Sequence, residues 1–135
     1  MVKFEEFKFK NNSIGLLIYT KFLDTGPHVD HTLGTEEGIY CYVEASHPQK
    51  EGDKTLLISD YIAPVSNGCF VLYYFMHGDS VGEFNVYKND TIDGQTQSNT
   101  IKGEQGFEWK QLSISISSAN EYRFILEGIV RLNLD

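Results

Sequence analysis

Residues 112–117 read Leu-Ser-Ile-Ser-Ile-Ser, and the upstream stretch 69–76 reads Cys-Phe-Val-Leu-Tyr-Tyr-Phe-Met. The first stretch alternates strictly between apolar and polar residues. It predicts a half-buried strand with Leu112, Ile114 and Ile116 in the core and the serines in solvent. The second stretch is apolar at every position, so neither of its faces suits water. It predicts a central strand with one face in the core and the other under a loop or a terminal segment.

Outward from these two stretches the chain shows almost no helical pattern. Short β-branched and aromatic runs alternate with Gly, Asn, Asp and Pro turn signals, one of them at residues 66–68. The polar span 89–106 predicts a hairpin excursion with a weak strand inside it. About eight strands with this punctuation predict an all-β antiparallel sandwich or jelly roll. The predicted strands are Phe4–Phe9, Ile14–Leu23, Gly38–Ala45, Thr55–Ser59, Cys69–His77, Gly82–Lys88, Phe107–Ser117 and Tyr122–Gly128, with Val130–Leu134 as a further candidate.

Length and composition narrow the class of protein. The 135 residues fit one domain, so residues 1–135 are predicted to form a single unit. Nine Phe, eight Tyr and one Trp among 41% hydrophobic residues exclude disorder. The net charge is −8 and the cations are scattered singly, which argues against binding nucleic acid or anionic lipid. No stretch approaches the ~20 apolar residues that span a bilayer, so no direct membrane insertion is expected.

Three further features bear on the cellular compartment. The opening segment 1–7 is interrupted by charges, so it does not predict a secretory signal. The triplets Asn11-Asn12-Ser13 and Asn89-Asp90-Thr91 are N-glycosylation sequons, which favour the secretory pathway only weakly because such triplets arise often by chance. Cys41 and Cys69 permit at most one disulfide, and only if their strands are neighbours. Free thiols are the expectation.

The densest polar cluster is segment 28–32, which reads His-Val-Asp-His-Thr. A zinc site requires three or four convergent ligands. Side chains on an extended segment diverge, so zinc is not expected here. Asp30 has two other interpretations: a carboxylate that accepts loop backbone N–H bonds, or an oxygen ligand of calcium. No nucleophile elbow, phosphate loop or dinucleotide fingerprint occurs, so no catalytic residue is predicted.

Several segments follow one another in a recognisable order. They are Thr25–Thr32 (Thr-Gly-Pro-His-Val-Asp-His-Thr), Gly38–Ser46, Gly52–Ser59, Cys69–Gly78, Gly82–Val86, Gly103–Trp109 and Phe124–Gly128. In this order and spacing they resemble the MAM domain of extracellular adhesion receptors and cell-surface proteases. The resemblance covers roughly residues 24–129. No single motif identifies the family; the resemblance rests on many motifs in the same order and spacing.

The chain departs from the family at its ends and at its cysteines. The cysteine pair expected near Phe4-Glu5 is absent, and Cys41 stands where the family has an aliphatic residue. Cys69 matches a family cysteine whose usual partner would lie beyond residue 135. Neither family disulfide is therefore expected to form as usual. A divergent or truncated copy and a sequence that has lost its termini are both compatible with this pattern.

The resemblance implies a jelly-roll (galactose-binding-like) sandwich that works by binding and is not an enzyme. It implies an extracellular adhesion module within a larger membrane or secreted protein. Such a module binds a protein partner and mediates either homophilic self-association or receptor oligomerisation. It also implies a structural calcium ion, with Glu5 and Asp30 as ligands and Asp135 as a third. A carboxylate that accepts backbone hydrogen bonds without any ion is an equal alternative for each residue.

A carbohydrate-binding jelly-roll module is the second hypothesis for the function. Such a module stacks sugars on exposed aromatic rings, for which Trp109, Tyr73 and Tyr87 are the candidates. The adhesion hypothesis expects these three rings to be buried, so their exposure separates the two hypotheses. The binding partner itself is not predicted, because the same sandwich serves many functions.

Overall fold

The computed structural model describes residues 2–3, 9–11, 17–20, 26–37, 40–43, 50–78 and 81–131. These residues form strands and turns, and within them no helix is present that could cross a membrane. The strands are β1 (Val2–Lys3), β2 (Phe9–Asn11), β3 (Leu17–Thr20), β4 (Tyr40–Val43), β5 (Lys54–Ser59), β6 (Val65–Tyr74), β7 (Glu83–Asp90), β8 (Gly94–Lys102), β9 (Lys110–Ser118) and β10 (Tyr122–Ile129).

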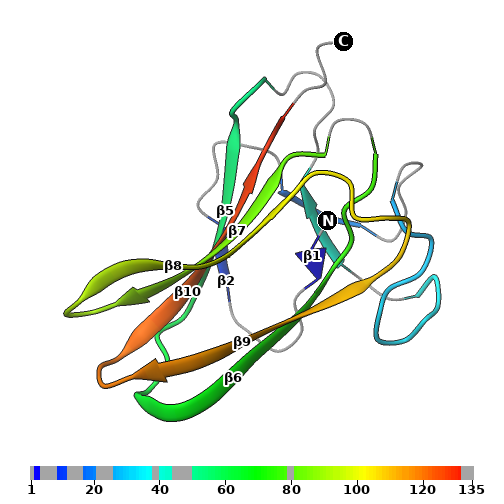
Figure 1. The fold of residues 1–135 in the computed structure, drawn as a ribbon. Helices are drawn as coiled ribbons and strands as arrows, with labels where there is room; N and C mark the ends of the chain where they lie inside the picture. Colours follow the sequence, from blue (N-terminus) through cyan, green and yellow to red (C-terminus); the bar gives the residue numbers. More distant parts are fainter. Residues whose placement is uncertain are drawn as a thin grey trace.

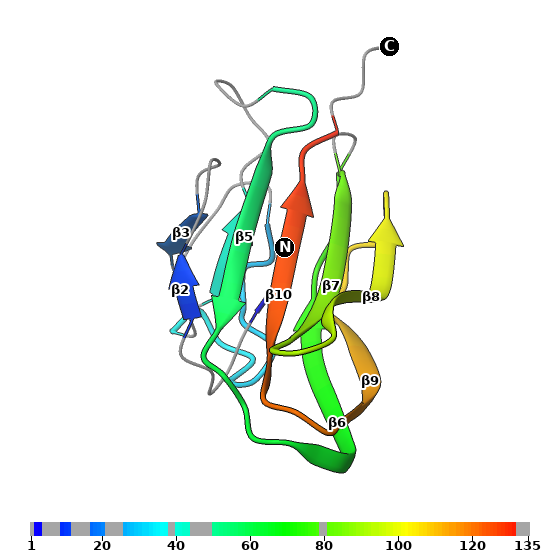
Figure 2. The ribbon, with the colours of Figure 1, turned by 90° about the vertical axis from the view of Figure 1, so that its left-hand side faces the viewer.

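Two five-stranded antiparallel sheets lie face to face (Figures 1 and 2). The β6 sheet has the order β3-β4-β1-β6-β9, and the β10 sheet has the order β2-β5-β10-β7-β8. Consecutive strands β5 and β6, β6 and β7, and β9 and β10 lie in opposite sheets, so the chain passes repeatedly from one layer to the other. This is the antiparallel jelly-roll sandwich that the sequence predicts.

The core lies between the two sheets and follows the alternation of their strands. Phe70 on β6 stacks on Phe124 of β10 with ring centroids 4.0 Å apart, and Val86 on β7 is fully buried. Ile114 and Ile116 of β9 point into this core while the serines between them are exposed, which confirms the strand predicted from residues 112–117. Burying side chains of this size stabilises the fold by about 1.5–3 kcal/mol each.

The apolar run at 69–76 is buried on both faces over only part of its length. Its inner side chains are in the core, but on the outer face Val71 is 41% exposed and Cys69 is exposed too. Further along, Tyr73 is covered by the loop that carries His31, and Phe75 is covered by Phe107 and Trp109. The prediction of a strand covered on both faces is therefore wrong for the first half of this stretch, because the covering loops reach only its second half.

The boundaries of β6 also differ from the prediction. The strand begins at Val65 and ends at Tyr74, so the expected turn at residues 66–68 lies inside it. The register against β9 shifts between Val65 and Gly68, so the turn-forming residues make a β-bulge instead of a turn.

Other predicted strands can also be compared with the structure. The polar span 89–106 holds the nine-residue strand β8, which pairs along its length with β7 across a shift opposite Val86 and Tyr87. The strand predicted from Phe107 begins only at Lys110. Val130 and Arg131 are not in a strand, and residues 132–135 lie outside the described residues. Residues 4–8 also lie outside them, between β1 in one sheet and β2 in the other.

The two cysteines are not on neighbouring strands. Cys41 lies on β4 and Cys69 on β6, with β1 between them. Val2 of β1 pairs with Cys41 on one side and with Tyr74 on the other, five positions along β6 from Cys69. The condition for a bridge between them is not met, and Cys69 is a free, exposed thiol.

Candidate interaction surface

The loop at residues 26–37 is organised around one buried carboxylate. Asp30 is 2% exposed, and its oxygens accept the backbone N–H of Thr32 at 3.1 Å and of Leu33 at 3.0 and 3.1 Å. Its own N–H donates to the carbonyl of Thr35 at 3.3 Å. Asp side chains favour such local turns because their short carboxylate reaches the backbone two or three residues on. The interpretation of Asp30 as an acceptor of loop N–H bonds is confirmed.

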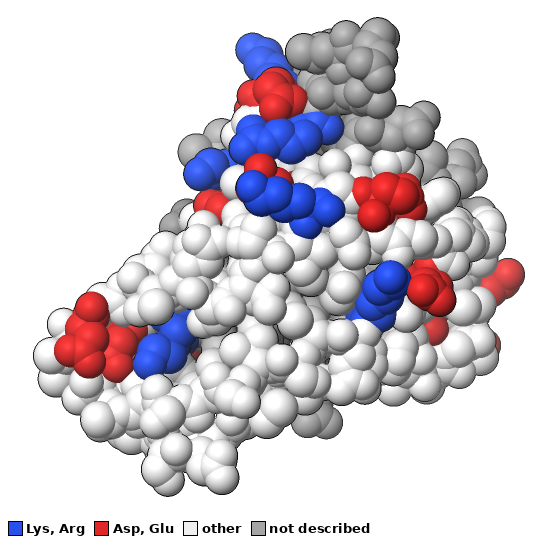
Figure 3. Space-filling view, in the orientation of Figure 1, with Lys and Arg blue, Asp and Glu red and all other residues white. Residues whose placement is uncertain are grey.

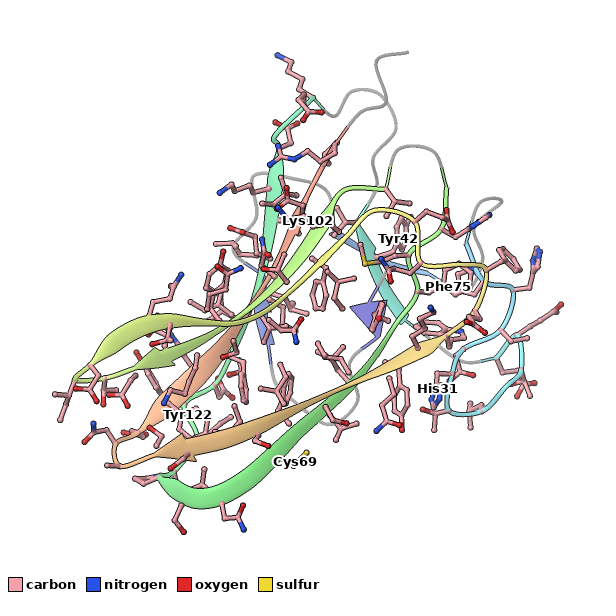
Figure 4. All side chains as sticks on the ribbon, in the orientation of Figure 1. His31, Tyr42, Cys69, Phe75, Lys102 and Tyr122 are labelled. Atoms are coloured by element: carbon pink, nitrogen blue, oxygen red, sulfur yellow. The ribbon has the colours of Figure 1, made fainter. Side chains whose placement is uncertain are left out.

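The same loop packs on the outer face of the β6 sheet. The ring of His31 stacks on Tyr73 with centroids 3.4 Å apart, and it meets Trp109 edge-on at 6.3 Å. The indole Nε1 of Trp109 donates to the carbonyl of Val29 at 3.0 Å. Figure 4 shows His31 and Phe75 at this side of the sandwich, next to the loop. Ring stacking and the hydrogen bond from Trp109 thus help to fix the loop to the sheet.

A second loop, residues 103–109, adds further rings beside the first. Phe107 meets Phe75 edge-on at 5.1 Å and His77 at 5.0 Å, and Phe75 meets Trp109 at 5.7 Å. Aromatic pairs in these geometries contribute about 0.5–1.5 kcal/mol beyond their buried area. Phe107 and Trp109 leave the strand pattern because they fold onto Phe75, which explains the late start of β9.

Glu104 anchors this second loop. Its carboxylate accepts the N–H of Gly78 at 2.6 Å and of Gly106 at 2.7 Å, and it contacts Nδ1 of His77 at 2.8 Å. The Gly78 N–H is the main cause that lowers the pKa of Glu104 to about 2, with His77 and Gly106 adding to it. The carboxylate is half-exposed, so water screens this interaction and its contribution to stability is modest.

Large apolar side chains remain in solvent on the two loops. Leu33 is 63% exposed, Phe107 59% and Val29 38%, and the half-buried Trp109 joins the loops through its bond to Val29. We call these four residues the two-loop surface. Figure 3 shows charged side chains near the top of the view, at the hairpin tip at lower left and on the right-hand side, with an uncharged area between these groups. Exposed apolar residues that gather on one side of a protein are typical of interaction sites.

The predicted calcium ligands are only partly covered by the structure. Glu5 and Asp135 lie outside the described residues, and Asp30 is the one of the three that can be placed. Within the described ranges, no group of three or more His, Cys, Asp or Glu residues is arranged to hold a metal ion. An oxygen ligand buried in a loop suits calcium, so the chemistry of Asp30 fits the ion.

The rings proposed as a sugar platform are not fully exposed. Trp109, Tyr73 and Tyr87 are each half-buried. One face of Tyr73 is covered by His31, and the hydroxyl of Tyr87 donates to Glu127 at 3.1 Å. Burial is the largest cause that raises the pKa of Tyr87, followed by the charge of Glu127. The three rings therefore meet neither expectation fully: they are neither open platforms nor buried core.

Sequence reasoning missed a second buried carboxylate. Asp90 is 5% exposed and accepts the N–H of Ile92 at 2.8 Å and of Asp93 at 3.0 Å. The hydroxyl of Ser118 and the amide of Asn120 also donate to it, at 2.8 and 3.1 Å. The backbone N–H of Asp93 is the first cause that lowers the pKa of Asp90 to about 2. The local sequence contains the turn-forming pair Asp93-Gly94, but no local pattern indicates the distant donors Ser118 and Asn120.

The sandwich with its Asp30 loop defines the class of protein. The chain matches the family model described as "MAM domain, meprin/A5/mu" over residues 18–133, and it belongs to that family. It is similar to "MAM domain-containing glycosylphosphatidylinositol anchor protein 2" of Rattus norvegicus, at 34% identity over 119 residues and 78% of this chain. The corresponding protein 1 of Gallus gallus is 36% identical over 112 residues, covering 79% of the chain.

A third relative carries a different kind of name. "Thyroid hormone-induced protein B" of Xenopus laevis is 35% identical over 108 residues and 78% of this chain. The chain spans 12% of the length of the Rattus and Gallus proteins and 15% of the Xenopus protein. It therefore corresponds to one segment of each of these larger proteins.

Proposed function

We propose that this chain is a non-enzymatic, extracellular protein-interaction module that makes adhesion contacts, including contacts with a second copy of itself. The observation that carries the proposal is the two-loop surface, which presents Leu33, Phe107 and Val29 to solvent around Trp109. Membership of the MAM family and relatives named for a glycosylphosphatidylinositol anchor support an extracellular setting, because such anchors hold proteins at the cell surface.

The net charge of −8 makes two copies repel each other at long range, so the attraction between them has to come from apolar contacts. The two loops also carry exposed carboxylates, which this attraction has to outweigh: Glu36, Glu37, Glu104 and Glu108. Burial of apolar area contributes about 25 cal/mol per Å², so a few exposed side chains give a weak contact. Weak contacts suit adhesion, where many copies on two surfaces act together.

A structural calcium ion belongs to the same proposal, with Glu5, Asp30 and Asp135 as its ligands. Asp30 supports it as a buried carboxylate in the loop that also carries Val29 and Leu33. An ion held there would fix the loop and, through it, half of the two-loop surface. Calcium supplies charge balance between carboxylates that otherwise destabilise one another.

Bead aggregation tests the adhesion proposal. Beads coated with the chain are expected to clump in calcium and to disperse when the two-loop surface is changed by Phe107→Ser or Leu33→Ser. Ile92→Ser is the matched control, because Ile92 is 75% exposed but lies on the β7–β8 turn, away from both loops. Beads that stay dispersed with the unchanged chain, or clumping that ignores Phe107→Ser and Leu33→Ser, would contradict the proposal.

A further inference from the structure

The sequon Asn89-Asp90-Thr91 lies where β7 ends, and its first residue faces outward. Side chains alternate along a strand, and Asp90 is buried in the bonding network described above, so Asn89 lies on the opposite, outer face of the β10 sheet. Asn89 is half-exposed. Its cross-strand neighbours are Arg123 on β10 and the exposed Gln95 on β8. The folded chain therefore leaves part of Asn89 exposed to solvent.

Arg123, the cross-strand neighbour of Asn89, contacts an exposed tyrosine ring. The guanidinium carbon of Arg123 lies 4.9 Å from the ring centroid of Tyr61, and that ring is 49% exposed. The Nε of Arg123 is buried and has no hydrogen-bond partner among the described residues. A buried donor without a partner is uncommon in folded proteins. Directly paired residues on antiparallel strands have Cβ atoms about 4.5–5.5 Å apart, so the base of the Arg123 side chain lies beside Asn89, and its guanidinium leads on to Tyr61.

We propose that Asn89 carries an N-linked glycan whose first N-acetylglucosamine lies over Tyr61 and Arg123. The sugar has an apolar ring face that suits the exposed tyrosine ring. It also has an acetamido carbonyl and hydroxyl groups that are able to accept hydrogen bonds from the guanidinium of Arg123. The glycan would then cover part of the outer face of the β10 sheet and leave the two-loop surface, on the other sheet, open to partners.

The transfer follows the usual chemistry of such sites. The donor is an oligosaccharide held as a polyprenyl diphosphate ester. The bond from its C1 to the diphosphate oxygen breaks, and the diphosphate leaves with the electron pair. C1 forms a new bond to Nδ2 of Asn89, which gives up one proton. In the folded chain Thr91 Oγ1 donates to the carbonyl of Glu121 at 2.9 Å, so the sequon is read before this turn closes.

Secretory expression tests the attachment. The chain is produced in cultured animal cells behind an added secretion signal, and total cell protein is treated with peptide N-glycosidase F and analysed by mass spectrometry. Glycosidase-dependent conversion of Asn89 to Asp is expected. It should disappear in Thr91→Ala and persist in Thr91→Ser, while Asn11→Gln removes the other sequon as a control. An unmodified Asn89 would overturn the proposal.

Thermal unfolding tests the packing of the first sugar. In the Asn11→Gln background, removal of the glycan from the folded protein is expected to lower Tm. The fall should be smaller in Tyr61→Ala and in Arg123→Ala, each compared with and without its own glycan. An equal fall in all three proteins would overturn the contact with Tyr61 and Arg123. The inference uses the proposed extracellular setting, but the added signal supplies the secretory route, so a failed adhesion assay and an unmodified Asn89 are separate results.

Discussion

Asp30 and Asp90 close two loops at opposite sides of the molecule with the same local geometry. Each buried carboxylate accepts the backbone N–H groups two and three residues further on, from Thr32 and Leu33 in one loop and from Ile92 and Asp93 in the other. Each loop also places an apolar side chain in solvent, Leu33 at 63% exposure and Ile92 at 75%. In Figure 1 the Asp90 loop is the hairpin tip at lower left, and the Asp30 loop lies at the right.

The difference lies in what reaches each loop from elsewhere in the chain. Asp90 also receives the side chains of Ser118 and Asn120, 28 and 30 positions away, so its carboxylate ties the β7–β8 turn to the β9–β10 turn. The Asp30 loop is held instead by His31 and Trp109 packing on the β6 sheet. The Asp90 network ties two turns together, and we call it the lock; its loop exposes a single apolar residue, Ile92. The Asp30 loop carries two exposed residues of the two-loop surface, Val29 and Leu33. The local motif alone does not distinguish the two loops; the contacts from distant residues do.

Removal of the lock is expected to have the largest effect on stability. Asp90→Ala leaves two backbone N–H groups and the side chains of Ser118 and Asn120 without their acceptor, and should lower Tm by roughly 10 °C for a chain of this size. Asp90→Asn keeps one oxygen and should lose less. Thermal unfolding by circular dichroism measures both. A Tm within about 2 °C of the unchanged protein for Asp90→Ala would show that the lock contributes little.

Calcium is expected to stabilise the Asp30→Asn and Asp90→Asn variants to different extents. If Asp30 is a ligand, calcium at 100 times its Kd stabilises the fold by about 2.7 kcal/mol, and Asp30→Asn abolishes that gain. Asp90→Asn should keep the gain, because the four donors to Asp90 leave it no role in binding the ion. Denaturant unfolding with calcium and with a chelator provides the measurement. Equal responses of the two Asn variants would remove the distinction between the loops.

Acid should weaken the lock over a defined pH range. The pKa of Asp90 is lowered from an ordinary 3.8 to about 2, so the folded state favours the ionised carboxylate. Its stabilisation is complete above the unfolded pKa and is lost as pH falls through the folded pKa. The Tm difference between the unchanged protein and Asp90→Asn should therefore be constant from pH 7 to about 5 and shrink towards pH 2. A difference that grows on acidification has the wrong sign for this account.

The exposed apolar residues should matter least for stability and most for association. Phe107→Ser and Ile92→Ser both change surface positions, and each should alter the free energy of unfolding by no more than about 0.5–1 kcal/mol. The change in the free energy of unfolding should be larger for Phe107→Ser, because Phe107 also contacts Phe75 and His77. Only Phe107→Ser should weaken self-association, measured by light scattering against concentration. Loss of association in Ile92→Ser as well would mean that any exposed apolar residue suffices.

The strand content could be predicted where side-chain pattern alone determines burial. The alternation at residues 112–117 is sufficient for β9, because a half-buried strand needs no information about its neighbours. The apolar run at 69–76 identified β6, but the exposure of Val71 depends on how far the 26–37 loop extends, which no local pattern contains. Strand β8 is rich in Gln, Thr, Ser and Asn, and it forms because it pairs with β7 along its length.

The candidate site could be predicted in the same partial way. The short carboxylate of Asp30 in a Gly-Pro loop indicated its local hydrogen bonds, and those bonds are present. The resemblance to MAM domains added the fold, which the family match confirms. The stacking of His31 on Tyr73 and the folding of Phe107 onto Phe75 bring together residues about 30–40 positions apart, and such contacts follow from tertiary packing alone.

Analytical ultracentrifugation of the purified chain tests the central claim most directly. Sedimentation is followed across concentration with about 1 mM calcium and with a chelator, for the unchanged protein and for Phe107→Ser. The account predicts a concentration-dependent dimer in calcium that weakens in the chelator and in Phe107→Ser. A monomer at every concentration and in both buffers would contradict self-association through the two-loop surface.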